Sequence, residues 1–239
     1  MPSTAQKGQA PSSRTGMREK IKKVATELLI KHGFHGTSFR DVAERCGITT
    51  TNIHYHFGSK QQLVEEVLTD YVDETAARHR SIWLNEGLSL PEKLRGVVTY
   101  NHERYRRFNR GRTSGRPWSL IGRLRLDSDV LSPAARQSLS SFTNTVHEAV
   151  GQAFAHATAT GELVADAPRE DLALLVINLV NSSSVFTHDA GSFERLEQFF
   201  GAFERVMLDL YLMAPRARES GARLRARSKA STPPAEHRA

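Results

Sequence analysis

The sequence predicts an all-α protein in which a small N-terminal helical domain precedes a larger helical domain. Three observations predict this class. Apolar residues recur at helical spacing along most of the 239 residues, no stretch of any length has the alternating period of a strand, and no internal repeat is visible. In addition, capping boxes mark helix starts at Ser59–Gln62 and Ser89–Glu92.

The first helix is expected from about Met17 to His32, with Ile21 and Leu28 in its buried stripe. Gly33 is a fitting end for it. Residues 1–16 are rich in Ser, Pro, Gly and Gln, so we expect a disordered arm there. Residues 1–23 carry six basic residues against one acid, and an arm of this kind can lie along a nucleic-acid backbone.

Two short helices follow, and they form the stretch around which the chain is organised. Residues 38–46 form an amphipathic helix, in which Cys46 is a small core residue, and Gly47 ends it where a positive φ costs least. A second helix is expected from about Thr50 to Phe57. A turn of 100° per residue places Ile53 and Phe57 on its inner side and leaves a face of small polar residues and one tyrosine outside.

This outer face has two interpretations. Small hydrogen-bonding side chains on a rigid helix suit base edges in a major groove, and the face has neither Glu nor Lys. Short amphipathic helix pairs are nevertheless common, so the geometry alone fits an ordinary structural pair equally well.

Helical patterns continue behind the pair. A long helix is expected from Ser59 to about Trp83, and another begins at Ser89. Further helices are expected after Ser132 and Pro168, the latter buried on both sides, and Ser192 is expected to cap the last one. Between them lies a stretch from residue 103 to residue 125 with eight arginines and one acid, and it contains a short helix or turn near Trp118.

Composition limits the classes of function. The single cysteine excludes an intramolecular disulfide and a multi-cysteine zinc site. No run approaches the roughly 20 apolar residues of a membrane span, and the N-terminus lacks the apolar core of a signal peptide, so we expect a cytoplasmic protein without a membrane partner. Residues 214–239 carry seven basic residues and two acids and are expected to be a disordered basic tail, which either binds nucleic acid weakly or only keeps the protein soluble.

From Ile21 to Leu68 the sequence resembles the DNA-binding domain of the TetR/AcrR (tetracycline-repressor) family of transcriptional regulators. The resemblance rests on motifs in order: His32-Gly33-Phe34, Gly36-Thr37-Ser38, Asp41-Val42-Ala43, Gly47-Ile48-Thr49, Asn52-Ile53-His54-Tyr55-His56-Phe57 and Ser59-Lys60 with Leu63. It implies a helix-turn-helix domain over residues 17–64, between the arm of residues 1–16 and a helical effector-binding and dimerisation domain over residues 65–213, with residues 214–239 as the tail. His54 departs from the tyrosine that is usual in the family.

The resemblance also implies which residues bind DNA. Base contacts are expected from Arg40, Thr50, Thr51, Asn52 and Tyr55, and phosphate contacts from Thr37, Ser38, His54, His56 and Lys60. Lys60 stands in the first turn of its helix, where a lysine opposes the helix dipole, and this favours a phosphate contact over a simple surface lysine.

The expected partners are a palindromic DNA operator, a second copy of the chain and a small-molecule effector. Candidate residues of the effector pocket are Tyr100, His102, Tyr105, Phe108, Trp118, Phe142, His147, Asn178, Asn181 and Phe186, although for any single one a core position is the more frequent role. Candidates for the dimer interface, not separated from core, are Leu175, Leu179, Phe199, Phe203 and Met207. The arginine-rich stretch is compatible with an anionic effector, but a solvated basic surface is the simpler interpretation.

The leading interpretation is therefore a ligand-responsive homodimeric transcriptional regulator, most often a repressor in this family. An architectural or division-associated DNA-binding protein without an effector is the alternative. No nucleophile elbow, phosphate-binding glycine loop or metal-ligand spacing is present, so neither an enzyme nor a cofactor is expected.

Overall fold

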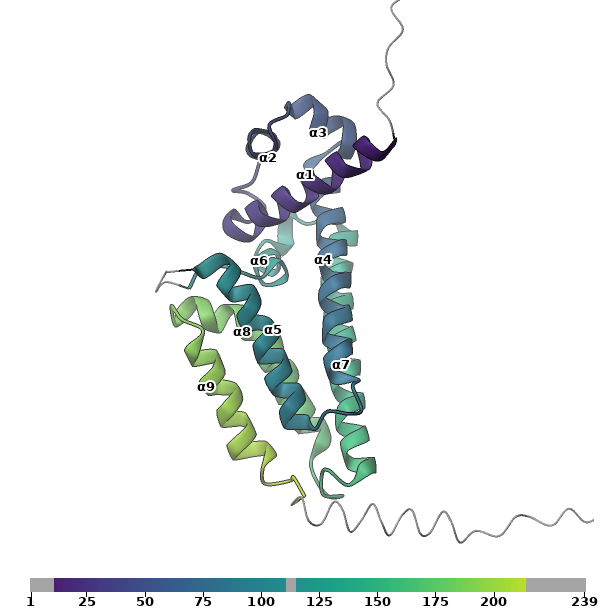
Figure 1. Ribbon diagram of the computed structural model, residues 1–239, viewed down its shortest axis with the longest axis vertical. Coiled ribbons are helices and arrows are strands. Elements are labelled where there is room, and N and C mark those ends of the chain that lie inside the picture. The colour runs from purple at the N-terminus through teal and green to yellow at the C-terminus, as the bar shows by residue number, and fades with distance from the viewer. Residues whose placement is uncertain (1–10, 111–114, 214–239) are drawn as a thin grey trace, which may run out of the picture.

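The computed structural model describes residues 11–110 and 115–213, and these ranges form an all-α molecule. Three helices, α1, α2 and α3, gather at one end, and the others run away from them (Figure 1). The elements in order are α1 (Pro11–His32), α2 (Phe39–Cys46), α3 (Thr50–Phe57), α4 (Lys60–Trp83), α5 (Leu90–Asn109), α6 (Leu120–Leu126), η1 (Ser128–Val130), α7 (Pro133–Thr160), α8 (Arg169–Asp189), α9 (Glu194–Phe203) and η2 (Glu204–Leu208). Among the described residues the only β-type pairing is an isolated bridge between Leu163 and Leu212.

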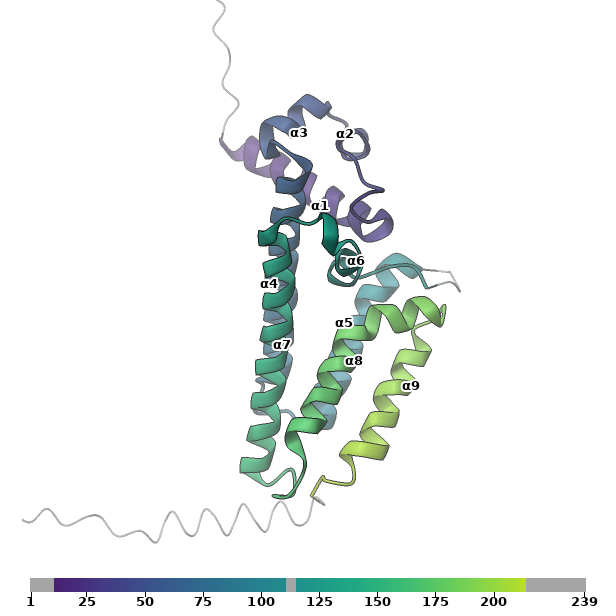
Figure 2. The same cartoon turned by 180° about the vertical axis from the view of Figure 1, so that it is seen from behind.

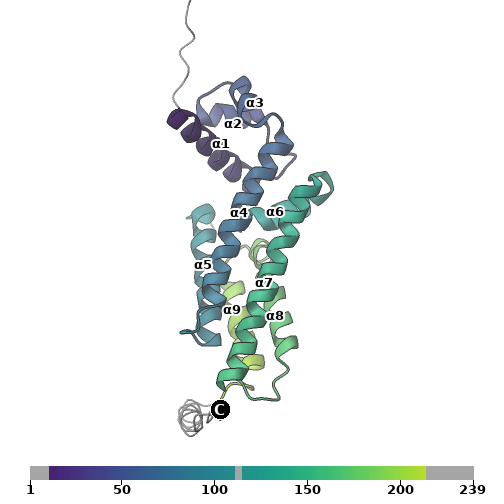
Figure 3. The same ribbon diagram turned by 90° about the vertical axis from the view of Figure 1, so that its right-hand side faces the viewer.

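Helix α4 connects the two parts of the molecule. Its first turns pack against α1 and α3, and the rest lies along α7 (Figure 3). Leu68 and Val72 of α4 are buried, as are Phe142 and Val146 of α7, so this contact is apolar. Seen from behind, α8 lies beside α7, and α9 covers the far side of α8 (Figure 2). The N-terminal helices are thus joined to the body by one long helix.

Most helix starts follow from the sequence. Ser59 and Ser89 form capping boxes with Gln62 and Glu92, as the three-residue spacing predicts. Gly161 ends α7 with φ of 77°, a conformation that is least costly for glycine. The predicted short helix near Trp118 is α6.

The first helix begins at Pro11, six residues before the predicted start, so the prediction of a disordered arm over residues 1–16 is wrong for residues 11–16. Proline fits the first helical position because it has no N–H to leave unpaired there. Met17 packs against the core, and extending an anchored helix costs far less than starting one. Residues 1–10 of the arm and the whole tail of residues 214–239 lie outside the described residues.

The last two helices also differ from expectation. Ser192 does not cap the last helix, since α9 begins at Glu194 after Phe193 and has no side-chain cap. It ends at Phe203 and passes into the single π-helical segment η2. Helix α8 was expected to be buried on both sides, yet Leu174 and Leu175 are 52% and 41% exposed in the protomer. Within the described ranges, no helix is both long and apolar enough to span a bilayer.

Candidate nucleic-acid interface and effector cavity

Helix α2 is held at both ends by local interactions. Asp41 N–H donates to the hydroxyl of Ser38 (3.3 Å), and Ser38 N–H donates to the carboxylate of Asp41 (2.8 Å). The Ser38 hydroxyl also donates to this carboxylate, and hydrogen bonds from the hydroxyl and from Ser38 N–H hold the pKa of the Asp41 carboxyl below its usual range. At the other end Gly47 adopts φ of 68°, which turns the chain toward α3. The turn between the two helices is therefore fixed by the sequence itself.

Helix α3 is fixed on its inner side and open on its outer side. Ile53 and Phe57 are buried against the first two helices, and Thr49 caps the start by accepting from Asn52 N–H (3.3 Å). Tyr55 is 65% exposed, and Thr51 is exposed as well. The helix contains no acidic residue. A rigid, acid-free helix with an open polar face is suited to a major groove.

The structure brings most of the predicted DNA-binding residues to this end of the molecule. Exposed members of the set are Ser38, Arg40, Thr50, Thr51, His54 and Tyr55, and half-buried members are Asn52, His56 and Lys60. The Nδ1 atom of His54 lies 2.8 Å from the carbonyl oxygen of Gly58, and the ring meets Phe39 edge-on. His54 is thus oriented by the end of its own helix and by α2.

Thr37 corrects the predicted set. Its side chain is buried, and its hydroxyl donates to the carbonyl oxygen of Gly33 (2.9 Å). This hydroxyl closes the turn between α1 and α2 and has no path to a phosphate. The sequence places Thr37 beside Ser38, but adjacent residues at a helix start point in different directions.

Lys60 has intramolecular contacts in the absence of DNA. Its ammonium lies 4.2 Å from the centre of the Phe34 ring. Burial lowers the pKa of Lys60, and the carboxylates of Asp41 and Asp127 oppose this effect. A phosphate contact by Lys60 would therefore replace or extend an existing cation–π contact.

Two basic residues of α1 hold α2 and α3 against it. They were not among the residues predicted from the sequence. Arg18 donates to the carbonyl oxygen of His56 and to Glu66, and its guanidinium lies 4.3 Å from the centre of the Phe57 ring. Lys20 donates to the carbonyl oxygen of Cys46 (2.9 Å). Sequence gives no signal for these contacts beyond the basic character of α1.

A second connection joins the end of α1 to the end of α6. Phe34 N–H donates to the carboxylate of Asp127 (2.7 Å), and Arg123 donates to the carbonyl oxygen of His32 (3.3 Å). Between these bonds lies Gly33, with φ of 71°, where an added Cβ would stand 2.5 Å from Asp127 Oδ2. We call these five residues the α1–α6 joint. It is a direct contact between the body and the end of α1.

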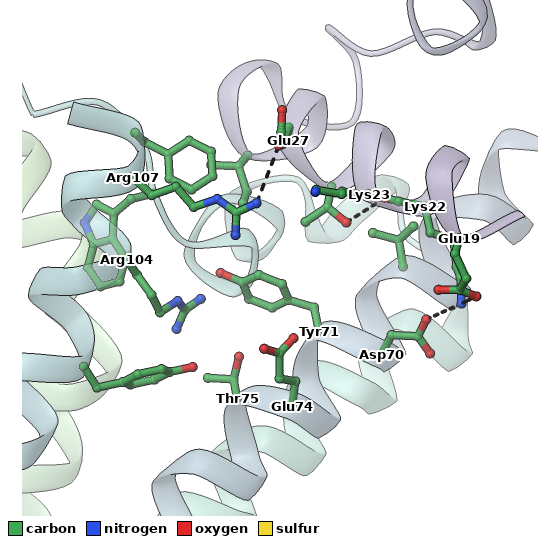
Figure 4. Close-up of a pocket in the computed structure, with 16 residues that line it drawn as sticks. Glu19, Lys22, Lys23, Glu27, Asp70, Tyr71, Glu74, Thr75, Arg104 and Arg107 are labelled. Carbon is green, nitrogen blue, oxygen red and sulfur yellow. Dashed lines mark hydrogen bonds and ion pairs between the residues drawn. The ribbon is translucent and has the colours of Figure 1, made fainter. Parts of the chain in front are cut away.

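A cavity of about 450 Å³ opens between α1, α4 and α5 (Figure 4). This volume lies in the range of roughly 300–1,000 Å³ that is typical of small-molecule sites. A second cavity of about 30 Å³ lies deeper, and Thr75, Arg104 and Trp118 line both. The larger cavity therefore borders the DNA-binding helices directly through α1.

Half of the predicted pocket residues border these cavities. Tyr100, Phe108 and Trp118 line the larger one, and Phe142 and Asn181 line the smaller one together with Trp118. Tyr100 and Phe108 lie on α5, Trp118 on the segment before α6, Phe142 on α7 and Asn181 on α8.

Three other predicted pocket residues pack against the last helix segment instead. His102 stacks on Phe193 with ring centres 4.5 Å apart, and Tyr105 packs on the same ring at 5.3 Å. Phe186 stacks on Phe199 at 4.8 Å. For these residues the pocket prediction is wrong because α9 covers the opposite face of α5 and α8.

The remaining two predicted pocket residues lie away from these two cavities. His147 is exposed on α7 and borders a separate surface hollow, and Asn178 is exposed and donates to the carbonyl oxygen of Leu174 (3.0 Å). Both residues follow the helical repeat, but they lie on its outer face.

Arg104 is the pocket residue that the sequence analysis missed. Its guanidinium carbon lies 4.8 Å, 5.1 Å and 5.6 Å from the ring centres of Tyr71, Tyr100 and Trp118 respectively. The sequence contains a pattern that could have identified Arg104, since Tyr100, Arg104 and Phe108 recur every four residues and share one face of α5. The many arginines around Arg104 made this pattern difficult to recognise.

The predicted dimer-interface residues divide into two groups. Leu175, Phe199 and Met207 are 41%, 46% and 36% exposed, which is unusual for large apolar side chains. Leu179 and Phe203 are buried within the protomer, so they take the core role that the sequence left open beside the interface role. The exposed members lie on α8, α9 and η2.

Comparison with known proteins agrees with this geometry. Residues 21–67 match the family model described as "Bacterial regulatory proteins, tetR family". The transcriptional repressor KstR2 of Mycolicibacterium smegmatis is 34% identical over 93 residues, which cover 39% of this chain and 45% of that protein. The transcriptional regulator UidR of Escherichia coli is 26% identical over 89 residues, 37% of this chain and 44% of that protein. The matches thus span less than half the length of these curated relatives.

The whole described fold resembles solved structures as well. A TetR transcriptional regulator from Chloroflexus aurantiacus aligns with 85% of this chain and 100% of its own, with a TM-score of 0.70 and 19% identity. Fold and sequence match together define the class of the N-terminal part, a helix-turn-helix domain. Over residues 21–67 this domain is similar to that of the bacterial regulatory proteins of the tetR family, and the chain as a whole shares the fold of the solved TetR regulators.

Proposed function

We propose that the chain is a homodimeric transcriptional repressor that binds a palindromic operator and is released by a small-molecule effector. The observation that carries the proposal is α3, which is held by Ile53 and Phe57 and presents an exposed, acid-free face around Tyr55. In this proposal residues 17–64 are the DNA-binding domain and residues 65–213 the effector-binding and dimerisation domain. The protein acts in the cytoplasm, without catalysis.

The α3 face supports direct reading of base edges. Thr50, Thr51, Asn52 and Tyr55 contact bases, and Arg40 reaches a guanine edge from α2. Phosphates are held by Ser38, His54, His56 and Lys60, which surround that face on neighbouring turns. These contacts fix the register of the protein on the duplex, whereas the base contacts supply the sequence preference.

An exposed apolar surface on the last two helices supports the dimer. It comprises Leu175 on α8, Phe199 on α9 and Met207 on η2, together with their exposed neighbours Leu174, Val206 and Leu210. Large apolar side chains gathered on one surface are typical of an interface. A two-fold dimer would place two α3 helices in successive major grooves about 34–36 Å apart.

The larger cavity supports an effector. It is lined by α1 of the DNA-binding domain as well as by α4 and α5 of the body, so a molecule bound there contacts both domains. A ligand that fits the cavity better in one arrangement of the domains shifts the equilibrium toward that arrangement. The dimer is released from DNA if the arrangement that the ligand favours changes the distance between the two α3 helices. That distance then no longer matches the spacing of successive major grooves.

Selection from a random duplex library tests the proposal. Purified protein at near-physiological salt is mixed with the library, and the retained duplexes are sequenced. We expect a motif with two-fold symmetry. Retention without any motif would contradict a regulator and favour an architectural DNA-binding protein, because binding would then rest on charge alone.

A further inference from the structure

Arg104 is a half-buried cation that forms no ion pair with an acidic residue of the described ranges. Its Nη2 is closed off from solvent and has no hydrogen-bond partner among these residues. Figure 4 shows the guanidinium directed into the space between Tyr71 and Thr75. An unpaired buried charge is strongly destabilising, so such a residue is unusual unless something else completes it.

The surroundings of Arg104 raise this cost further. Burial lowers the pKa of Arg104 to about 10, and the neighbouring cation Arg107 acts in the same direction. The guanidinium nevertheless remains charged at neutral pH. The aromatic rings around it compensate only in part, because a cation–π contact is weaker than a charged hydrogen bond.

A second arginine in the same region, Arg125, is half-buried and has its hydrogen-bond acceptors within the protein. Arg125 donates to the hydroxyl of Thr143 (2.9 Å) and to both the side-chain oxygen (3.1 Å) and the carbonyl oxygen (3.3 Å) of Asn181. Arg104 has no equivalent set. The difference between the two residues is that Arg104 borders the large cavity and Arg125 does not.

The other charges of the cavity are largely paired with one another at its rim. Lys22 bridges Glu19 and Asp70, each at 2.7 Å, and Arg107 lies 3.6 Å from Glu27. Glu74 also lines the cavity and is exposed, and Figure 4 shows its carboxylate near Tyr71 and Thr75 without an ion pair to Arg104. The inner wall, by contrast, combines the Arg104 charge with aromatic and aliphatic surface.

We propose that the effector is a monocarboxylate with an apolar body, whose carboxylate is bound by Arg104 inside the box formed by Tyr71, Tyr100 and Trp118. The proposal rests on the proposed function, because it takes the cavity as the effector site. A guanidinium can hold a carboxylate through two parallel hydrogen bonds. The apolar body then lies along Ile30 and Phe108, so that the ligand spans from α5 to α1.

The same geometry disfavours other ligand classes. An aromatic box can bind a quaternary ammonium ion, but here the box already contains the cation Arg104, which would repel a second one. A neutral apolar ligand would fill the cavity and leave the guanidinium without a hydrogen-bond partner. A neutral carbonyl oxygen would accept from the guanidinium but more weakly than a carboxylate, which also balances the charge.

Matched carboxylate and amide probes test the assignment. Benzoate, 3-phenylpropanoate and octanoate are each compared with the corresponding primary amide at millimolar concentration, by thermal shift and by calorimetric titration of the full chain. We expect at least one carboxylate to bind and its amide to bind about tenfold more weakly or not at all, since a charged hydrogen bond is lost. Binding of no carboxylate, or equal binding of acid and amide, would overturn the proposal.

Variants identify the residue responsible. Arg104→Gln should abolish the preference for the acid over the amide. Arg107→Gln, on the same helix at the rim, should keep it, and Glu74→Gln should bind the acid at least as tightly because a competing anion is removed. If Arg104→Gln does not fold, Arg104→Lys replaces it, with about a threefold or greater weakening expected from loss of the two-point contact. Unchanged acid binding by the Arg104 variant would refute the assignment.

A DNA assay separates failure of this inference from failure of the proposed function. Binding of a selected duplex is measured for the wild type and Arg104→Gln with and without the probe acid. We expect both proteins to bind the duplex, and only the wild type to be released by the acid. Release of both would refute the role of Arg104 while leaving the regulator intact. If the wild type selects no sequence, the proposed function fails, whatever binds at Arg104.

Discussion

At the scale of single residues, the molecule separates exposed candidates for DNA contact from groups that serve the fold. Tyr55 is exposed on α3, whereas Thr37, in the turn before α2, is buried and bonded to the backbone. The two lie in the same N-terminal region of the chain and would be hard to rank from composition alone. Because Tyr55 is exposed and Thr37 is buried, substitution of Tyr55 should change DNA binding, whereas substitution of Thr37 should change stability.

Tyr55→Ala should reduce sequence preference. Loss of a base contact costs about 1–3 kcal/mol on the operator and little on random DNA. Lys60→Ala is the matched comparison, because a phosphate contact should weaken both duplexes alike and lower the salt slope by about 1. Fluorescence anisotropy with the two duplexes at several salt concentrations measures both effects. Equal losses for Tyr55→Ala on operator and random DNA would remove Tyr55 from the base-reading set.

His79 should make stability depend on pH. Its ring is buried between Tyr100 and Phe142, its Nδ1 has no partner, and desolvation lowers its pKa to about 4. In the unfolded chain the pKa is about 6.5, so between these values the unfolded state binds more protons and stability falls as pH decreases. The full loss is roughly 3 kcal/mol.

Urea unfolding from pH 7 to pH 4 measures this loss. His79→Leu should flatten the decline, because the buried titrating group is gone, whereas His147→Gln on the exposed face of α7 should leave it unchanged. An equally steep decline in His79→Leu would assign the pH dependence to other groups.

At the scale of elements, the sequence determines helix ends more reliably than helix neighbours. The spacing of Ser59 and Gln62 is a local signal for a capping box, and the structure contains that box at the start of α4. The partners of His102 and Phe186, in contrast, lie 91 and 13 residues further along the chain, on Phe193 and Phe199. Helical periodicity shows that a face is apolar but does not show which helix covers it. Five of the ten predicted pocket residues lie away from the two cavities for this reason or because they are exposed.

The same limit explains Arg104. Charge counting describes the arginine-rich stretch as a basic surface, and for its exposed members that is correct. The burial of one arginine depends on where α5 meets α4, which is a tertiary property. Ser192 is a comparable case, since a cap requires an extended backbone before the helix, and Phe193 is already helical there.

The α1–α6 joint predicts a difference between two glycines. Gly33 and Gly47 both have positive φ, but a Cβ on Gly47 would meet nothing within 4 Å, whereas one on Gly33 would meet Asp127 and Arg123. Gly47→Ala should therefore cost about 1 kcal/mol from backbone strain alone. Gly33→Ala should lower the free energy of unfolding by clearly more. The added Cβ would also force the side chains of Asp127 and Arg123, and with them α6, to shift. Urea unfolding of both variants measures the two costs, and equal values would show that the joint tolerates the side chain.

At the scale of the whole molecule, the proposed regulator binds its operator as a dimer of two copies. One protomer exposes an apolar surface on α8, α9 and η2 at a distance from its α3 (Figure 1). The fold class and the helix-turn-helix were predictable because their signals are local: periodicity, caps and the motif order. The division of Leu175 and Phe199 from Leu179 and Phe203 was not, because all four fit the same helical pattern and only packing separates exposed from buried members.

Phe199→Glu should prevent dimerisation. The side chain is 46% exposed, and a carboxylate there would be buried without a partner in the dimer. Leu84→Glu, with 41% exposure at the end of α4, is the matched control and should remain a dimer. Sedimentation velocity gives the mass of each. A dimeric Phe199→Glu variant would place the interface elsewhere.

The most direct test of the dimeric, base-reading regulator is a change in the spacing of its operator. Affinity is measured for the selected duplex and for the same duplex with about five base pairs, half a helical turn, inserted between its half-sites. The second half-site then faces the opposite side of the DNA. We predict that affinity falls close to that for random DNA, because the two α3 helices can no longer enter both major grooves. Unchanged affinity would contradict recognition by two linked helices.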